Sequence, residues 1–320
     1  MLRIATAALF LMWTVLPASS GTTVFRTQEL GTTNQREAII HIPDTALASK
    51  TPLPVLFVLH DQGETPAEIK YASHLLQAAD RNGVIVVFPS GHTRAKAKGY
   101  YWSVPPFLES EEEPTPVEDD AFLKEILDRL DIQKVLDRDN VFIAGFAAGG
   151  SMAYQLGCLF PREYAGVISV AGTMTTQACA EGPSTSLLHL HGFDDTVMPY
   201  LGGKSASAAS TSQPDIIWPD VMSGIRDWKS RQNCRVAKES APNEDTLCTE
   251  SRCSGDTLAR TCLSFSSRHE WMGAKTYNEW KHRKGTETET SSLNATREIW
   301  DFIRRLTASK EPPSQASSDT

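Results

Sequence analysis

The stretch VFIAGFAAGG, residues 141–150, decides the fold class of this chain. Its first four residues are apolar and suit a strand that is buried on both faces of a sheet. The glycines that follow permit a tight turn, and the residues after Gly149 and Gly150 have helical periodicity up to Pro161. A buried strand, a turn and a helix in this order form one unit of an α/β fold.

The same alternation recurs along the chain. Short apolar runs, each predicting a buried strand, occupy residues 38–42, 55–59, 84–88, 167–171, 187–190 and 258–265. Helical periodicity predicts helices over residues 67–81, 120–136 and 296–306, the first of them ended by the pair Asn82-Gly83. We therefore predict one α/β domain over residues 21–307, with a mainly parallel sheet flanked by helices.

Composition argues against several classes of protein. The chain has 320 residues, of which 40% are hydrophobic and 22% charged, and its formal net charge is −8. These values indicate a globular protein without the basic surface that nucleic acid requires. No run reaches the ~18 uninterrupted apolar residues of a membrane-spanning helix. An acidic loop at 109–120, a Ser/Ala-rich loop at 202–214 and a disordered polar tail at 308–320 are expected outside the core.

Residues 1–20 have the pattern of a secretory signal peptide. A basic start at Arg3 precedes an apolar segment over residues 4–16, and small residues follow at 17–21, where signal peptidase would cleave. A membrane anchor and a buried first helix are the alternatives. Both are disfavoured, because the apolar segment is too short to span a bilayer and polar residues follow it. We expect a secreted, extracellular protein.

Six cysteines agree with this compartment, because an even number in a secreted chain predicts disulfide bonds. They are Cys158, Cys179, Cys234, Cys248, Cys253 and Cys262, for which 15 pairings are possible. The spacing of Cys248 and Cys253 could suit zinc, but no histidine or second close pair completes such a site. Neither a metal nor a cofactor is expected. Asn294-Ala295-Thr296 is a glycosylation sequon.

Residues that can do chemistry follow four of the apolar runs. His60-Asp61-Gln62 follows residues 55–59, the turn around Ala147 follows 141–144, Asp195 follows 187–190 and His269 follows 258–265. Ligands of α/β sheets bind beyond the carboxyl ends of the strands, so we expect these residues to lie together. A glycine-flanked turn, then an acid, then a histidine is the chain order of catalytic triads in α/β-hydrolases.

Further motifs occur in a fixed order along residues 35–307. They are residues 54–60, residues 139–141 before the turn, Phe160-Pro161, His191-Gly192 with Asp195 and residues 197–200, Trp228 before Asn233-Cys234, and His269 with Trp271. In this order and spacing they resemble the secreted polyhydroxybutyrate depolymerase and feruloyl esterase family of α/β-hydrolases. The resemblance implies a disulfide-stabilised α/β-hydrolase fold and a serine carboxylesterase, with Asp195 as the triad acid, His269 as the triad base and the nucleophile at position 147.

The resemblance also bears on the cysteines. It implies a disulfide between Cys234 and Cys253. A bond between Cys158 and Cys179 would join the end of the helix after the turn to the loop after the next strand, which leaves Cys248 with Cys262.

Position 147 departs from the family. The turn reads G-x-A-x-G where the family has G-x-S-x-G, and the methyl group of Ala147 cannot attack a carbonyl. Loss of a triad nucleophile lowers turnover by on the order of 10^6. The remaining rate is roughly 10^3 to 10^4 times that of the uncatalysed reaction in water. The drifted residues around His269, with Ser266-Ser267-Arg268 before it, are a further departure.

The expected oxyanion loop, formed by Asp61, Gln62 and Ala148, differs as well, because Asp61 stands where the family has glycine. If the Asp61 carboxylate points inward, its repulsion would weaken oxyanion binding by on the order of a few kcal/mol. The alternative is that the carboxylate points to solvent.

Other polar residues near the site have structural interpretations. Ser151 lies one helical turn beyond position 147, a shift of about 5–6 Å, so we interpret it as a small residue at a packed helix start. Asp195 could simply cap a turn, and His269 could bond a loop. We interpret His60 and His191 as buried structural histidines. Trp271 and Tyr200 either line a pocket or belong to the core.

Two interpretations of function follow. In the first, the chain is a secreted, catalytically impaired relative of these esterases, a pseudoenzyme whose pocket binds a small ester, an aromatic acid, or a glycan or polyester. In the second, it is an active carboxylic ester hydrolase in which the Asp195/His269 pair uses water or another serine. An engineered serine-to-alanine substrate trap is disfavoured, because Asp61 and the residues around His269 have changed too. A protein-binding role is the remaining class.

Overall fold

The computed structural model describes residues 21–28, 35–49, 51–94, 98–105, 115–175, 179–180, 182, 185–205, 216–274 and 293–308. The expected signal peptide at 1–20 lies outside these residues. The tail expected at 308–320 was placed one residue too early, because Ala308 is still part of a helix, and its remaining residues also lie outside the described ones. Among the helices that the structure describes, none is long and apolar enough to cross a membrane.

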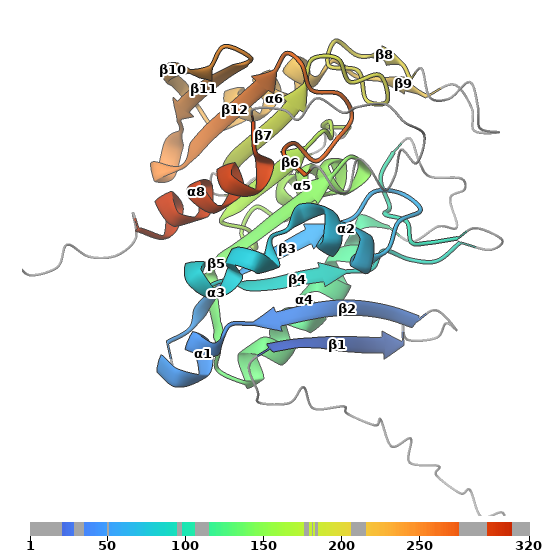
Figure 1. Ribbon diagram of the computed structural model, residues 1–320, viewed down its shortest axis with the longest axis vertical. Coiled ribbons are helices and arrows are strands. Elements are labelled where there is room, and N and C mark those ends of the chain that lie inside the picture. Colours follow the sequence, from blue (N-terminus) through green and yellow to red (C-terminus); the bar gives the residue numbers. More distant parts are fainter. Residues whose placement is uncertain are drawn as a thin grey trace, which may run out of the picture.

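One ten-stranded sheet forms the centre of the described part of the chain, in the order β1-β2-β4-β3-β5-β6-β7-β12-β11-β10 (Figure 1). Its strands are β1 (Gly21–Gln28), β2 (Gln35–Ile42), β3 (Leu53–Leu59), β4 (Ile85–Pro89), β5 (Leu136–Phe146), β6 (Gly166–Val170), β7 (Ser186–Gly192), β10 (Arg235–Asn243), β11 (Thr246–Arg252) and β12 (Leu258–Ser264). The six from β4 to β12 in this order pair in parallel, and the strands outside them pair antiparallel. The predicted mainly parallel sheet is confirmed.

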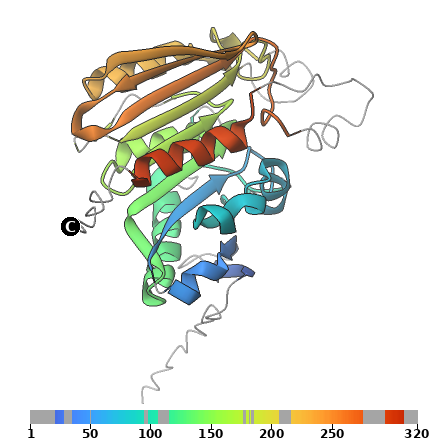
Figure 2. The ribbon, with the colours of Figure 1, turned by 60° about the vertical axis from the view of Figure 1, so that its left-hand side comes forward.

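Helices cover both faces of the sheet. They are α1 (Asp44–Ser49), α2 (Pro66–Ser73), α3 (Leu76–Asn82), α4 (Pro116–Ile132), α5 (Ala148–Leu159), α6 (Val221–Arg231) and α8 (Ala295–Ala308), with a 3-10 turn at η2 (Ser254–Asp256). Helices α2, α3 and α8 pack on one face, and α4, α5 and α6 pack on the other (Figures 1 and 2). This is the layered arrangement of an α/β fold.

Strand β5 shows why the central runs are apolar throughout. Val141 and Ile143 belong to the core on the α4 and α5 side, whereas Phe142 and Ala144 belong to the core on the α8 side. Side chains of a strand alternate between faces, so a strand covered on both faces needs apolar residues at every position. The antiparallel strands β1, β10 and β11 lack such runs, and the sequence did not reveal them.

The predicted helix over residues 67–81 was wrong in one respect, because the chain breaks there into α2 and α3. His74 ends α2 with a φ of 51°, and Leu76 begins the next helix. The apolar residues on either side of the break, Ile69 and Ala79 among them, face the same core. The periodicity is therefore preserved across the break, which explains why it predicted one helix.

The predicted limits of the next helix, 120–136, were also wrong. Helix α4 begins at Pro116 and ends at Ile132, so residues 116–120 of the expected acidic loop are its first turns and Leu136 begins β5. Thr115 and Glu118 form a capping box, and Pro116 occupies the first helical position. Both are ordinary start signals, and the acidic composition concealed them.

Three disulfides connect the second half of the described chain. They join Cys158 to Cys179, Cys234 to Cys253 and Cys248 to Cys262, which are the expected pairs; the resemblance implied the second of them. The last one links the neighbouring strands β11 and β12, at directly opposed positions. Gly203 and Lys204 of the expected Ser/Ala-rich loop form β8 (Gly203–Lys204), which pairs with β9 (Ile217–Trp218).

Candidate functional site

Ala147 lies at a sharp turn between β5 and α5, which we call the elbow. Its φ of 50° and ψ of −114° are unfavourable for a residue with a side chain. Its N–H donates to the Val170 carbonyl at 2.9 Å, which ties the turn to β6. The turn requires the glycines beside it. A Cβ on Gly145 would lie 2.1 Å from the carbonyl carbon of Gly149, and a Cβ on Gly149 would lie 2.5 Å from the His60 carbonyl oxygen.

Asp195 and His269 meet beyond the carboxyl ends of β7 and β12. The Asp195 Oδ2 accepts a hydrogen bond from His269 Nδ1 at 2.8 Å, and its Oδ1 accepts from the backbone N–H groups of Val197 and Met198. Burial raises the pKa of Asp195, but the charge of His269 and its hydrogen bond outweigh burial and hold that pKa below its usual value. The carboxylate is therefore ionised and fixes the imidazole with its Nδ1 proton toward the acid.

Phe146 links this pair to the elbow. Its ring lies 5.1 Å from the His269 ring, centroid to centroid, and it directly precedes Ala147. The structure thus brings together the elbow, the acid and the histidine, which are about 120 residues apart in the chain.

The Asp61 carboxylate points inward, toward the start of α5. Its Oδ1 accepts hydrogen bonds from the N–H of Gln62 at 2.8 Å and from the N–H of Ala148 at 3.2 Å. Asp61 N–H in turn donates to the Glu64 carboxylate at 3.4 Å. An anion at a helix N-terminus is electrostatically favourable. Of the two orientations that the sequence left open, the structure shows the inward one.

Comparison with known proteins agrees with this geometry. Residues 103–215, which include the elbow and Asp195, match a family model described as phospholipase/carboxylesterase. NocK of Nocardia uniformis subsp. tsuyamanensis, which is named as an esterase, is 27% identical over 266 residues, or 76% of this chain and 75% of that protein. Feruloyl esterase C of Emericella nidulans is 27% identical over 175 residues, which span 53% of this chain and 58% of that esterase.

Solved structures give the same fold. The acetyl xylan esterase of Aspergillus awamori superposes with a TM-score of 0.54 at 15% identity, covering 81% of this chain and 98% of its own. The S-formylglutathione hydrolase of Agrobacterium tumefaciens also gives a TM-score of 0.54, at 13% identity, covering 90% of this chain and 97% of its own. The chain has the α/β-hydrolase fold and is similar to esterases.

A network that sequence reasoning missed holds the Asp61 loop of this α/β-hydrolase. Gly91 N–H donates to His60 Nε2 at 3.0 Å, so His60 Nδ1 carries the proton that it donates to the Asp61 carbonyl at 2.7 Å. Trp102 Nε1 donates to the His60 carbonyl, and the Gln62 side-chain amide makes two hydrogen bonds with the Trp102 backbone. Burial lowers the pKa of His60 to about 4, so it is neutral, as its structural interpretation required.

A second buried network, which the sequence did not predict, supports Asp195. Tyr154 OH donates to His189 Nδ1 at 2.8 Å, and His189 Nε2 lies 3.3 Å from His191 Nδ1. His191 Nε2 then donates to the Met198 carbonyl at 2.9 Å, within the turn that holds Asp195. Burial lowers the pKa of both histidines, which favours this chain of neutral rings. His191 is a buried structural histidine.

Ser151 and Trp271 have structural roles. Ser151 Oγ accepts from the Thr173 N–H at 3.1 Å and contacts the Ala147 carbonyl, and the side chain is fully buried. Trp271 is also fully buried and donates to Thr296 Oγ1 at 3.0 Å, so it belongs to the core. No group of three or more His, Cys, Asp or Glu side chains that could hold a metal occurs in the part of the chain that the structure describes.

Three neighbouring rings that lie within five residues of Asp195 or His269 in the chain form a partly exposed cluster, which we call the aromatic rim. Phe193 lies 6.0 Å from Tyr200 and 6.1 Å from Phe265, centroid to centroid. Phe193 is 42% exposed and Phe265 46% exposed. Adjoining exposed apolar side chains of this kind mark interaction surfaces.

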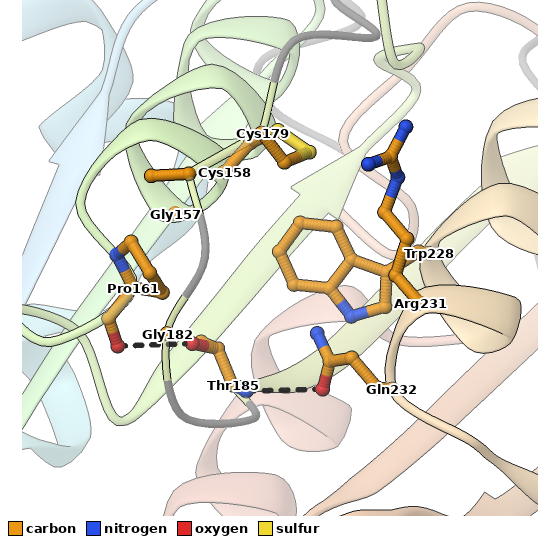
Figure 3. Close-up of a pocket in the computed structure, with 10 residues that line it drawn as sticks. Gly157, Cys158, Pro161, Cys179, Gly182, Thr185, Trp228, Arg231 and Gln232 are labelled. Atoms are coloured by element: carbon orange, nitrogen blue, oxygen red, sulfur yellow. Dashed lines mark hydrogen bonds between the residues drawn. A yellow bond between two sulfur atoms is a disulfide. The ribbon is translucent and has the colours of Figure 1, made fainter.

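A cavity of 320 Å³ lies at the other end of α5 (Figure 3). The disulfide between Cys158 and Cys179 and the indole of Trp228 form its walls, and the Gln232 side chain accepts from the Thr185 N–H at its edge. Because α5 spans Ala148–Leu159, this cavity is about 15 Å along the helix from the elbow. It belongs to the packing of α5 and α6 and not to the Asp195–His269 site.

Proposed function

We propose that this protein is a secreted, catalytically impaired relative of the carboxylic ester hydrolases, which binds its ligand and does not cleave it through an acyl-enzyme. The observation that carries the proposal is Ala147 at the elbow. The elbow of an α/β-hydrolase holds the nucleophile above the sheet. A methyl group has neither a lone pair nor a proton to exchange with His269.

The acid–base pair does not replace the missing oxygen. The hydrogen bond between Asp195 and His269 can orient an imidazole that takes a proton from water. Water is not held covalently, so the reaction loses the division into two easier steps that a side-chain nucleophile provides. Serine hydrolases without their nucleophile retain roughly 10^3 to 10^4 over the uncatalysed rate, far below normal turnover.

A retained ligand site is supported by the aromatic rim. The rings of Phe193, Tyr200 and Phe265 lie next to Asp195 and His269 in the chain, and two of them are more than 40% exposed. Rings combine large contact area with little loss of conformational entropy, which suits them to ligand binding. Small esters, aromatic acids, glycans and polyesters all have faces that such rings contact.

Secretion is supported by two independent observations. Three disulfides occur in the structure, and such bonds persist in oxidising compartments. Residues 1–20 have the composition of a signal peptide. Secretion also makes Asn294 a candidate glycosylation site, since it begins a sequon.

The test is the hydrolysis of p-nitrophenyl acetate and methyl ferulate by the purified native chain, together with labelling by a fluorophosphonate. We expect no covalent adduct by mass spectrometry, and a rate that His269→Ala changes less than threefold. Turnover of about 1 s⁻¹ or more, typical of enzymes, that His269→Ala abolishes would contradict the proposal. Peptide mapping of any adduct would then identify another serine as the nucleophile.

A further inference from the structure

We propose that Asp245 is a positioning residue for the acid–base pair, which holds the His269 loop against Asp195 through the hydroxyl groups of Ser264 and Ser267. Asp245 lies in the turn between β10 and β11, far along the chain from the elbow. The inference does not rest on the proposed function, because it concerns how the pair is held and not whether an ester is cleaved beside it.

Two serine hydroxyl groups and the Asp245 carboxylate form a chain of hydrogen bonds. Ser267 Oγ donates to Ser264 Oγ at 2.7 Å, and Ser264 Oγ donates to Asp245 Oδ2 at 2.7 Å. A carboxylate only accepts hydrogen bonds, so it fixes the direction of both donors. Both serines are fully buried, where chained hydrogen bonds strengthen one another. The carboxylate therefore orients the serine that lies two residues before His269.

The backbone of the same segment is bound to Asp245 as well. The N–H of Ser266 donates to Asp245 Oδ1 at 2.7 Å, and the N–H of Phe265 donates to the Asp245 carbonyl at 2.8 Å. Together with the hydroxyl of Ser264, Asp245 thus receives hydrogen bonds from three consecutive residues at the end of β12. The start of the loop that carries the base moves only with the turn between β10 and β11.

The other side of this segment is bound to the turn that carries the acid. The N–H of Asp194, the residue before Asp195, donates to the Ser267 carbonyl at 3.2 Å. Gly192 permits the close approach, since a Cβ at this position would lie 2.3 Å from the Ser267 carbonyl oxygen. The segment before the base therefore bridges Asp245 and the turn of the acid.

This support matters because the hydrogen bond of the pair depends on its alignment. The acid is held within its own turn, where the N–H groups of Val197 and Met198 donate to Asp195 Oδ1. His269 Nδ1 reaches Asp195 Oδ2 at 2.8 Å from a separate loop, so the base depends on what holds that loop. Ser267, one of the residues by which the chain departs from the family it resembles, supplies part of this support.

The tautomer of His269 in the native chain provides the readout. Histidine labelled with ¹⁵N in its ring gives separate signals for Nδ1 and Nε2, which show which nitrogen carries the proton, and His269→Ala assigns them. At a pH high enough to keep the imidazole neutral, we expect the Nδ1–H form to predominate in the native chain, because Asp195 accepts from Nδ1.

We expect Asp245→Ala to lower the ratio of the Nδ1–H to the Nε2–H form by about tenfold, since a misaligned hydrogen bond to a charged group loses much of its strength. Ser267→Ala should lower the ratio in the same direction by a smaller factor. A native chain in which the Nε2–H form predominates, or an unchanged ratio in Asp245→Ala, would overturn the proposal.

Thr249→Val is the matched control. Thr249 and Thr261 share a hydroxyl hydrogen bond of 2.7 Å between β11 and β12, the strands on either side of the same anchoring contacts. The variant should lower the free energy of unfolding and leave the His269 tautomer ratio unchanged. If Asp245 only stabilises its own turn, Asp245→Ala would behave like this control, and Asp245 would not be a positioning residue.

Combining the changes tests the chain of hydroxyl groups. If Asp245 acts through Ser267, the ratio in Asp245→Ala/Ser267→Ala should equal that in Asp245→Ala within about twofold, because the two residues belong to one network. Multiplication of the two fold-changes would show that they act independently, which contradicts the chain. Should Asp245→Ala not fold, Ser267→Ala decides against Thr249→Val, and equal ratios in these two variants would overturn the proposal.

These outcomes are distinguishable from failure of the proposed function. That proposal fails if the native chain forms a covalent adduct or turns over esters. The proposal for Asp245 fails on tautomer ratios at His269, whatever the rate of the native chain.

Discussion

The two halves of the candidate site differ in which features of a catalytic triad they contain. The acid–base half, formed by Asp195 and His269 on the loops after β7 and β12, has both the geometry and the side chains of a catalytic pair. The elbow half, formed by Ala147 and Asp61 after β5 and β3, has only the backbone geometry. The backbone of an elbow is therefore a property of the fold, whereas its chemistry depends on a single side chain.

Packing explains how the elbow persists without a nucleophile. Backbone angles such as those of Ala147 cost on the order of 1–3 kcal/mol and persist where the surroundings over-determine them. Here Gly149 lies against the β3 backbone, and a Cβ on Gly172 would lie 2.7 Å from the Ala147 carbonyl oxygen. The close approach of β3, β6 and α5 fixes the turn, whichever side chain it carries.

The largest effect is expected where the two halves are combined. In the Ala147→Ser/Asp61→Ala background, Asp195→Asn or His269→Ala should reduce the kcat for p-nitrophenyl acetate by about 10^3 to 10^4, because the first change removes the group that orients the base and the second removes the base itself. The same two changes in the native chain should leave the rate unaltered. Equal rates with and without His269 in the restored background would show that the acid–base half has lost its function too.

Much of the sheet and the position of the candidate site could be predicted from the sequence. Seven apolar runs predicted strands that the structure contains, and the residues after four of them, among them Asp61, Asp195 and His269, do gather at one edge of the sheet. These predictions succeed because a strand buried on both faces leaves a clear pattern and because parallel strands end at the same edge.

The side-chain hydrogen-bond networks could not be predicted from the sequence. Nothing in the pattern paired Trp102 with the His60 carbonyl or Tyr154 with His189, because these contacts join segments that meet only in the folded sheet. The orientation of Asp61 was open for the same reason, since it depends on the N–H of Ala148, 87 residues away. The break at His74 was hidden because it leaves the apolar spacing intact.

Disulfides allow the stability of the halves to be compared. Cys248–Cys262 joins β11 to β12, the strand before His269. Cys158–Cys179 joins the end of α5, the helix after the elbow, to the segment that follows β6. Their sequence separations are 14 and 21, so removing either pair with alanines should lower the free energy of unfolding by about 3 kcal/mol. Urea unfolding would measure both. A negligible loss for one pair would show that its half is held by packing alone.

Low pH should decrease the free energy of unfolding through His60, which lies beside the elbow half of the site. Its pKa falls from the ordinary value of 6.5 to about 4 on folding, so the unfolded chain binds a proton first as the pH decreases. Stability is therefore full above pH 6.5 and should fall by about 2–3 kcal/mol by pH 4.5 from this group. Asp195, whose pKa is lowered by folding, loses its contribution only below its ordinary value of 3.8.

Urea unfolding of the native chain and of His60→Asn at pH 7 and pH 4.5 would isolate this contribution. We expect the native chain to lose more stability between the two pH values than the variant does. His189 and His191, whose pKa values burial also lowers, remain in both proteins and cancel in the comparison. Identical losses would mean that His60 is not protonated on unfolding in this range.

The smallest effect concerns the anchoring of the acid–base half. Asn294 precedes α8, and its Oδ1 accepts from the Arg297 N–H at 2.9 Å, while Ala295 N–H donates to the Met272 carbonyl of the His269 segment. Loss of such a helix cap typically costs about 1 kcal/mol. Asn294→Ala should therefore lower the free energy of unfolding by about that amount, and Asn294→Asp, which keeps the accepting oxygen, should not.

Both of these variants remove the glycosylation sequon, so they separate the cap from any attached glycan. Expression in a secreting eukaryotic host should yield native protein with added glycan mass if Asn294 is modified, and both variants without it. If native protein from that host is more stable than Asn294→Asp, and the two are equally stable when produced without glycosylation, the glycan stabilises the start of α8. If native protein and Asn294→Asp are equally stable in both hosts, and Asn294→Ala is less stable than either by about 1 kcal/mol, the oxygen that caps the helix accounts for the whole effect.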